Sequence, residues 1–298
     1  MPFDTTFITL GTAGGPVPKL HRAAPAHAIK YGDRVILIDC GEGAMQQLMR
    51  VGIDFRRIDK VILSHHHFDH IGSLFTCLGI NMMLQRKQPI TIYGPLGTRQ
   101  IVEGLAMACD VPQAIGFGVT GQSLPHPRDF VSVEEIAPGV TFEIDDIRIS
   151  CCENTHYRTE TELGTKGPIS LSLRFDAPDR SIVYTGDTGP CRMVENLAKG
   201  AQLLVGEMML AEQIIAQLQE KNPHMTLERI AMMGQHLHSH HLSPEQLGDL
   251  AARAGVAHVV AVHIPLDSIT PKTAPEFTAR ISQVFSGQVS IANDLDQF

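Results

Sequence analysis

One run of ten residues, VILSHHHFDH at positions 61–70, constrains this chain more than any other segment. Its apolar, β-branched start predicts a buried strand that ends near Ser64, so the histidines that follow lie on a strand-to-helix loop. Proteins of the α/β class place their chemistry on such loops. The spacing His65-x-His67-x-Asp69-His70 offers imidazole and carboxylate ligands that suit zinc or a neighbouring first-row metal ion. A solvated histidine-rich loop is the alternative, and for His66 we favour that ordinary loop role.

Strand-like and helical patterns alternate along the whole chain, and no Ser/Pro-rich linker or low-complexity tract divides them. This organisation predicts an α/β fold with residues 1–298 as a single domain. A hairpin is expected at Gly32-Asp33, a helix at 43–52 and an apolar helix at 71–84. Ser243 and Pro244 begin a capped helix over 244–254. The other strand-like segments are 6–12, 141–154, 169–176, 181–187, 203–208 and 258–263.

Several of these strands end on a residue with metal affinity, which is a second sign of a metal site. They are His65, His156, Asp187 and His263. We expect one edge of the sheet to collect them, as the ligand-binding edge of an α/β protein does.

Composition limits the classes of function and location. The 298 residues are 43% hydrophobic, which is enough for a large core that does not need a metal to fold. The formal net charge of -8 shows no basic excess, so we expect no nucleic-acid partner. The six scattered cysteines are typical of reduced thiols in a cytoplasmic protein. Neither a secretory leader nor a segment of membrane-spanning length is visible, so no membrane partner is expected.

Together these motifs resemble the metallo-β-lactamase superfamily. The H-x-H-x-D-H loop is similar to its signature, and further segments follow in the superfamily's order over nearly the whole chain. They are LGTAGG, LIDCGEG with Asp39, ENTH with His156, YTGDTGPC with Asp187 and VVAVHI with His263. Residues 185–208 and 241–264 most resemble ribonuclease Z and its phosphodiesterase and arylsulfatase relatives. The resemblance implies a four-layer αββα sandwich.

The resemblance also implies two divalent metal ions, with zinc expected first and manganese or iron(II) as alternatives. The ligands would be His65, His67 and His156 for one ion, Asp69, His70 and His263 for the other, and Asp187 as the bridge. Asp39 and Glu207 would orient ligating imidazoles or their loop. The alternative for these two acids is a strand-end residue that caps a turn.

The implied chemistry is hydrolysis by a bridging hydroxide, formed because two ions lower the pKa of a shared water. Asp69 would accept the proton of that water. His241 corresponds to a histidine that faces the scissile phosphate in the ribonuclease Z branch, and it would donate to the leaving group. The neighbouring His240 is the alternative for the inward-facing position. His240, His238 and His21 are candidates for contacts with an anionic substrate, and solvent-exposed side chains are the alternative.

One departure from ribonuclease Z concerns the arm that grips tRNA, which lies between the histidine of ENTH and the bridging aspartate. Here only residues 157–186 intervene, and their four basic residues are balanced by four acidic ones. Processing of the tRNA 3′ end is therefore ranked low. Residues 157–168 are either a lid over the metals or an ordinary surface loop.

The sequence thus predicts a metal-dependent hydrolase of a small anionic ester, with a phosphodiester first. Arylsulfatase and lactone or carboxylic ester hydrolase are the alternatives. Iron redox proteins of this fold resemble a pattern with glutamate at the position of His67, and a metal-free scaffold would be expected to lose ligands, so both are disfavoured. A homodimer through the apolar helix 71–84 is expected.

Overall fold

The computed structural model describes residues 4–119, 121 and 123–298 and shows two compact units. Unit 1 comprises the chain up to Gly11, Ala23–Ala137 and Asp294–Phe298, and unit 2 comprises Thr12–Arg22 and Pro138–Asn293. Each unit contains one sheet and its own core. The single-domain organisation stays a prediction.

The sheet of unit 1 is mixed and, within the described residues, has six strands in the order β1-β2-β3-β4-β5-β6. The strands are β1 (Thr5–Gly11), β2 (Ala26–Tyr31), β3 (Arg34–Ile38), β4 (Lys60–Ile62), β5 (Ile90–Gly94) and β6 (Val131–Glu135). The first three pair antiparallel, and β3 to β6 run parallel. Tyr31 pairs with Arg34, so Gly32 and Asp33 form the predicted two-residue turn, with Gly32 at a φ of 57°.

The helices of unit 1 pack against this sheet. They are α1 (Ala44–Arg50), the 3-10 helix η1 (Phe55–Arg57), α2 (Phe68–Ile71), α3 (Leu74–Met83), α4 (Thr98–Ala108), α5 (Asp110–Ile115) and α6 (Pro127–Phe130). Leu48 of α1, Leu78 of α3 and Val102 of α4 enter the same core as the strand residues. The helix predicted at 71–84 is two elements, because α2 ends at Ile71 and α3 begins at Leu74.

The sheet of unit 2 is also mixed and, among the residues described, has seven strands in the order β13-β12-β11-β10-β9-β8-β7. The strands are β7 (Thr141–Ile144), β8 (Ile147–Glu153), β9 (Leu171–Asp176), β10 (Ser181–Tyr184), β11 (Leu203–Glu207), β12 (His258–Val262) and β13 (Gln288–Ile291). The strand-like run 141–154 is therefore a hairpin, which turns at Asp145 and Asp146. Strands β8, β10, β11 and β12 all point the same way.

The remaining helices lie in unit 2. They are the 3-10 helix η2 (Glu160–Glu162), α7 (Arg192–Ala198), α8 (Ala211–Lys221), α9 (Leu227–His240), α10 (Pro244–Ala254) and α11 (Ala274–Ser282). The predicted helix 244–254 is confirmed as α10. Its capping box joins Ser243 and Gln246, and Gly255 ends it at a φ of 64°.

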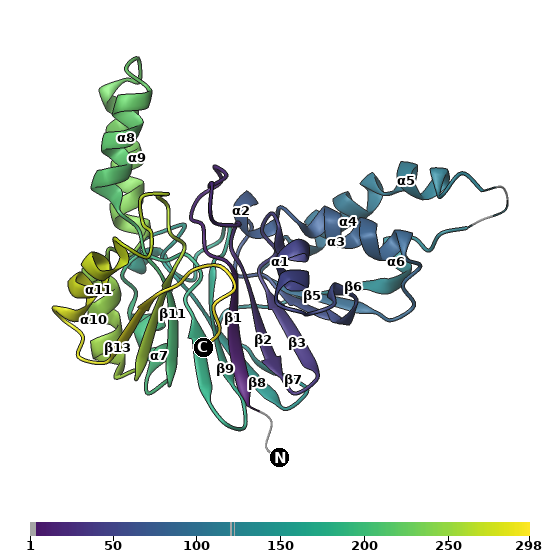
Figure 1. Ribbon diagram of the computed structural model, residues 1–298, viewed down its shortest axis with the longest axis horizontal. Coiled ribbons are helices and arrows are strands. Elements are labelled where there is room, and N and C mark those ends of the chain that lie inside the picture. Colours follow the sequence, from purple (N-terminus) through teal and green to yellow (C-terminus); the bar gives the residue numbers. More distant parts are fainter. Residues whose placement is uncertain (1–3, 120, 122) are drawn as a thin grey trace. The chain divides into compact units, whose positions relative to one another are not determined.

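A helical hairpin of α8 and α9 projects from the rest of unit 2 (Figure 1). Both helices are fully described, and only Ala211 and Gly234 in them are buried. A β-carbon added at Gly234 would lie 3.2 Å from the Ile215 side chain, so the two helices approach closely there. This hairpin is not predicted from the sequence. No helix in the described part of the chain has the length and apolarity needed to cross a membrane.

Candidate metal centre

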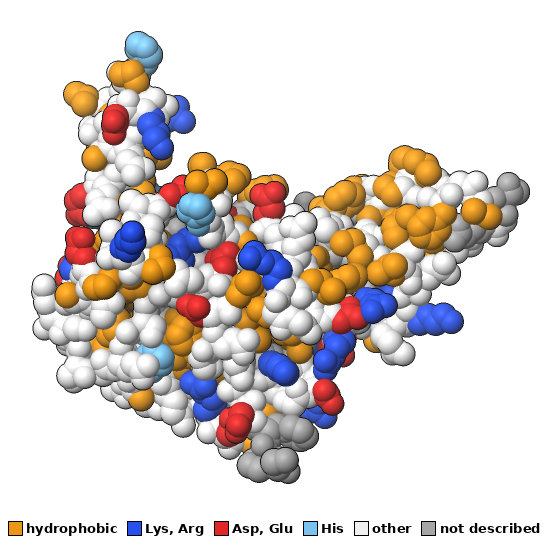
Figure 2. All heavy atoms as spheres, in the orientation of Figure 1, with side chains coloured by type: hydrophobic (Ala, Val, Ile, Leu, Met, Phe, Trp, Pro, Cys, Tyr) orange, Lys and Arg blue, Asp and Glu red, His pale blue; other side chains and the backbone are white. Residues whose placement is uncertain are grey.

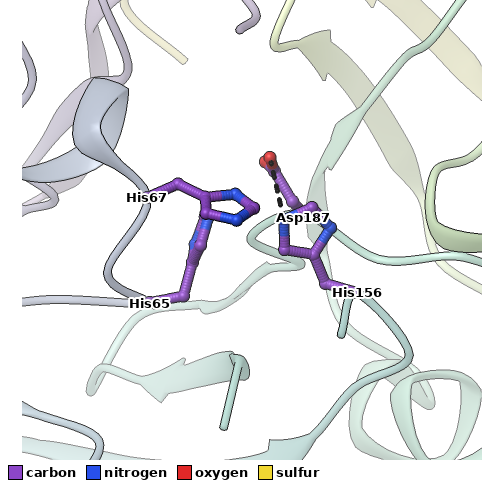
Figure 3. A group of neighbouring side chains, drawn as sticks. All are labelled: His65, His67, His156 and Asp187. Atoms are coloured by element: carbon purple, nitrogen blue, oxygen red, sulfur yellow. Dashed lines mark ion pairs between the residues drawn. The ribbon is translucent and has the colours of Figure 1, made fainter. Parts of the chain in front are cut away.

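The histidine-rich loop of unit 1 follows β4 and leads into α2. His65, Asp69 and His70 are buried, and His67 is half-buried. Figure 3 shows His65 and His67 leaving the same loop. Their ring centroids are 4.9 Å apart, and those of His65 and His70 are 4.0 Å apart. The loop therefore gathers the imidazoles that its sequence spacing predicts.

Asp39 fixes this loop from the end of the neighbouring strand β3. Its carboxylate accepts hydrogen bonds from Ser64 N at 2.7 Å, from Ser64 Oγ at 2.9 Å and from His70 Nδ1 at 2.8 Å. The bond to Nδ1 sets the tautomer of His70 and leaves its Nε2 as the ligand atom. His66 points elsewhere, since its Nε2 lies 2.8 Å from Thr98 Oγ1. Its position agrees with the ordinary loop role expected for it.

Unit 2 collects its own candidate ligands at one edge of its sheet. Strands β8, β10 and β12 run in the same direction, so the residues after their carboxyl ends meet: His156, Asp187 and His263. All three are at most 3% exposed. Asp187 Oδ2 lies 3.1 Å from His263 Nε2 and 3.8 Å from His156 Nε2, the pair joined by the dashed line in Figure 3. Imidazoles around a carboxylate are a typical divalent-metal ligand set.

His241 and Glu207 form a buried pair beside these residues. Glu207 ends β11, and its Oε2 accepts a 2.7 Å hydrogen bond from His241 Nδ1. Burial disfavours the charged imidazole, but the charge and hydrogen bond of Glu207 outweigh this effect and raise the pKa of His241 above its ordinary value. One ligand-type atom each from Asp187, His241 and His263 lie within 4.8 Å of one another. The arrangement can hold a proton donor at the edge where the ligands gather.

The side chain of His240 bonds to Thr155, so His241 is the one of these two neighbours that lies beside Asp187 and His263. The Nδ1 of His240 donates to Thr155 O at 2.7 Å, while its own carbonyl accepts from His156 Nδ1 at 3.2 Å. His240 therefore fastens the end of α9 to the loop that carries His156. The bond also leaves Nε2 of His156 as its ligand atom.

Two further candidates for substrate contact are exposed, and one of them shares a cavity with His241. His238 is exposed on α9, with Nδ1 3.9 Å from Glu212 Oε1, and it lines a cavity of about 220 Å³ together with His241 and Arg280. His21 is exposed on the loop Thr12–Arg22. His236 belongs to the same histidine-rich segment as His238 and His240, for which the sequence favours a solvated position, and its ring lies 5.4 Å from that of His241. The signal that could have found it is its four-residue spacing from His240, which puts both on one helix face.

The loop 157–168 is held in place by contacts within unit 2. Arg158 is buried, donates to the carbonyls of Thr165 and Pro168, and lies 3.4 Å from Glu153. Gly164 N also donates to Glu153, at 2.7 Å. These bonds are those of an ordered surface loop.

Comparison with known proteins identifies the family. The model of the beta-lactamase superfamily domain matches residues 34–264. The chain belongs to this superfamily. It is 29% identical over 296 residues to a ribonuclease Z of Mycolicibacterium gilvum (strain PYR-GCK), with 97% of this chain and 94% of that protein covered.

Solved structures agree on the fold. The metallo-β-lactamase fold protein YhfI of Bacillus subtilis aligns with a TM-score of 0.69 at 18% identity, covering 99% of this chain and 98% of that one. The short form of human tRNase Z aligns with a TM-score of 0.66 at 19% identity, covering 98% of each chain. The α/β class, the metallo-β-lactamase fold with its two mixed sheets, and a hydrolase of this superfamily are thereby confirmed.

One expectation is wrong. The relatives named ribonuclease Z and tRNase Z act on RNA, which contradicts the prediction that no nucleic-acid partner is involved. The error came from net charge, which averages over the whole chain. Binding to a phosphate backbone depends instead on the local charges that face it, and metal ions contribute to them.

Proposed function

We propose that this protein is a divalent-metal-dependent phosphodiesterase and that an RNA phosphodiester is its first candidate substrate. The observation that carries the proposal is the buried Glu207–His241 pair beside Asp187 and His263. A phosphodiester with an alkoxide leaving group needs a proton donor as that group departs, and an oriented imidazole is the common choice.

The ligand chemistry of both units fits divalent ions. In each unit a buried histidine has its Nδ1 bound, His70 by Asp39 and His156 by the His240 carbonyl, which is how metal-binding imidazoles are usually oriented. We propose the full ligand set given by the superfamily resemblance. It comprises His65, His67 and His156 for one ion, Asp69, His70 and His263 for the other, and Asp187 between them, with zinc as the metal.

In the proposed reaction, residues of this chain have separate roles. Two divalent ions, when bound, supply an activated water and polarise a phosphoryl oxygen. Asp69 accepts the proton of the attacking water. His241 donates from Nε2 to the leaving oxygen, because Glu207 occupies its Nδ1 and fixes the tautomer. Asp39 keeps the ligand loop in place through Ser64 and His70.

The relatives named ribonuclease Z, which match 97% of this chain, support RNA as the first substrate class. A small phosphodiester is the second candidate, and one observation favours it. The segment 157–186 is short and balanced in charge, and its buried Arg158 bonds to its own loop, so it offers no basic arm. Sulfate and carboxylic esters have no comparable support.

A substrate panel tests the proposal. Zinc- or manganese-loaded protein is offered an RNA with a 3′ extension, bis(p-nitrophenyl) phosphate, p-nitrophenyl sulfate and a lactone. We expect both phosphodiesters to be cleaved, the activity to disappear with a chelator and the Asp187→Ala variant to be inactive. Turnover of the sulfate or the lactone alone would refute the phosphodiesterase assignment. Cleavage of the small diester without cleavage of RNA would replace the first substrate class by the second.

We also propose that the protein is a homodimer that forms through unit 1. The helix predicted at 71–84, through which a dimer is expected, offers little apolar surface, because Phe75 and Leu84 are the only exposed large hydrophobic side chains in this fully described segment. Hydrophobic side chains gather instead over α4 and α5 (Figure 2). The exposed ones are Met107 of α4, Val111 and Ile115 of α5, and Phe117 and Val119 in the segment that follows α5. Apolar strips of this kind are typical of contact surfaces.

A cytoplasmic location stays a prediction.

A further inference from the structure

The ring of His236 lies beside three other imidazoles of unit 2. Its ring centroid lies 6.0 Å from that of His156, 5.4 Å from that of His241 and 5.4 Å from that of His240. His156 and His241 are 1% and 5% exposed, whereas His236 is exposed. His236 is therefore the most exposed member of this group of rings.

The helix that carries His236 is fixed against the candidate ligands. The end of α9 is joined to the loop of His156 by the two hydrogen bonds that involve His240. Gly189, two residues after Asp187, lies so close to α9 that an added β-carbon would be 2.1 Å from Ser239 O. His236 is one helical turn before His240, so its position relative to His156 and Asp187 is set by these contacts.

α9 contacts α8 on a different face from the one that carries His236. Gly234 faces Ile215 of α8, and His238 also contacts that helix at Glu212. His236 is two residues after Gly234, about 200° around the helix. Replacement of an exposed side chain on that face should leave the unfolding temperature unchanged.

We propose that His236 is a substrate-binding residue that donates a hydrogen bond to a non-bridging phosphoryl oxygen and thereby positions the phosphoryl group for His241. The proposal rests on the proposed phosphodiesterase function. An imidazole always carries at least one N–H donor, and phosphoryl oxygens are strong acceptors. The ligand class is thus a phosphoryl group, from a diester substrate or from free phosphate.

Two variants and a matched control test this role in the zinc-loaded full-length protein. His236→Ala removes the donor, His236→Asn keeps a shorter one, and Gln235→Ala truncates the adjacent exposed residue of α9. Calorimetry measures the binding of inorganic phosphate, and steady-state kinetics with bis(p-nitrophenyl) phosphate separates KM from kcat. Zinc content and thermal unfolding are measured for every variant.

We expect His236→Ala to weaken phosphate binding and to raise KM by about tenfold, with a smaller change in kcat, as the loss of one hydrogen bond to a charged group would. His236→Asn should recover part of both effects, and Gln235→Ala should behave as the wild type. Zinc content and unfolding temperature should not change. Equal phosphate binding and equal KM in the two alanine variants would overturn the proposal, as would a loss of zinc in His236→Ala alone.

Failure of the proposed function would look different. If the wild type cleaves no phosphodiester, that function falls, while the phosphate titration still decides the role of His236. If the wild type is active and His236→Ala binds phosphate as well as the wild type does, the function stands and the role of His236 is withdrawn.

Discussion

The carboxylates of Asp39 and Glu207 each orient a histidine, but the two histidines have different proposed roles. Asp39 accepts a hydrogen bond from His70 Nδ1 at 2.8 Å, and Glu207 accepts one from His241 Nδ1 at 2.7 Å. His70 belongs to the proposed ligand set, while His241 is the proposed acid. Asp39 and His263 also have positive φ angles, 54° and 56°. Such conformations cost about 1–3 kcal/mol in a residue other than glycine and cluster at functional sites.

Removing the imidazole of His241 tests its role as acid. For a diester with an alkyl leaving group, His241→Ala should lower kcat by about a hundredfold or more, because the alkoxide departs without a proton. For a nitrophenyl diester the loss should be smaller, since nitrophenolate departs unaided. Steady-state kinetics on the two substrates measures the difference. Equal losses on both would mean that His241 binds the substrate or shapes its loop.

Glu207→Gln should change the pH dependence of the same step. His241 must be protonated to donate, and Glu207 raises the pKa of His241, so the acid stays protonated to a higher pH in the wild type. Glutamine keeps a hydrogen-bond acceptor but removes the charge. The alkaline limb of the kcat profile should therefore move to lower pH in the variant, at unchanged zinc content. A limb that stays in place would separate Glu207 from the acid.

At the scale of elements, strand direction brings the unit 2 residues together. His156, Asp187, Glu207 and His263 all lie at or just beyond the carboxyl ends of strands that run in the same direction. His241 does not follow a strand. It is the residue directly after α9, and its backbone is extended. The close approach of Gly189 to the last turn of α9 therefore links the strand-end residues to the helix that leads into His241.

Gly189→Ala tests that link. The added β-carbon would lie 2.1 Å from Ser239 O, and backbone cannot yield cheaply, so the end of α9 must move. We expect the metal-free variant to lose about 1–3 kcal/mol of stability in urea unfolding and the protein to bind zinc more weakly. Gly79→Ala is the control, because nothing lies within 4 Å of the new atom inside α3. It should gain about 0.5–1 kcal/mol. A neutral Gly189→Ala would mean that the contact is not tight.

At the scale of the whole molecule, the sequence predicted most where a local signal exists. Strand patterns and the residues that follow them located His65, His156, Asp187 and His263, and the Ser243 capping box gave the bounds of α10. The α8–α9 hairpin was missed; only Ala211 and Gly234 of its residues are buried, so its two helices pack mainly on each other rather than in the core of unit 2. The position of His236 beside His156 depends on a contact across eighty residues of sequence, which no local pattern encodes.

The last prediction concerns assembly, and it rests on the apolar strip of α4 and α5. Val111 is 68% exposed and Ile115 66% exposed, which is costly for a strip that stays in water. Light scattering at micromolar concentration should give the mass of a dimer. The Val111→Glu/Ile115→Glu variant should be a monomer, because two copies would bury four carboxylates at the contact. Leu227→Glu, at an 80% exposed position at the start of α9, is the matched control and should remain a dimer. A monomeric wild type, or a dimer that survives both changes on α5, would exclude this surface as the interface.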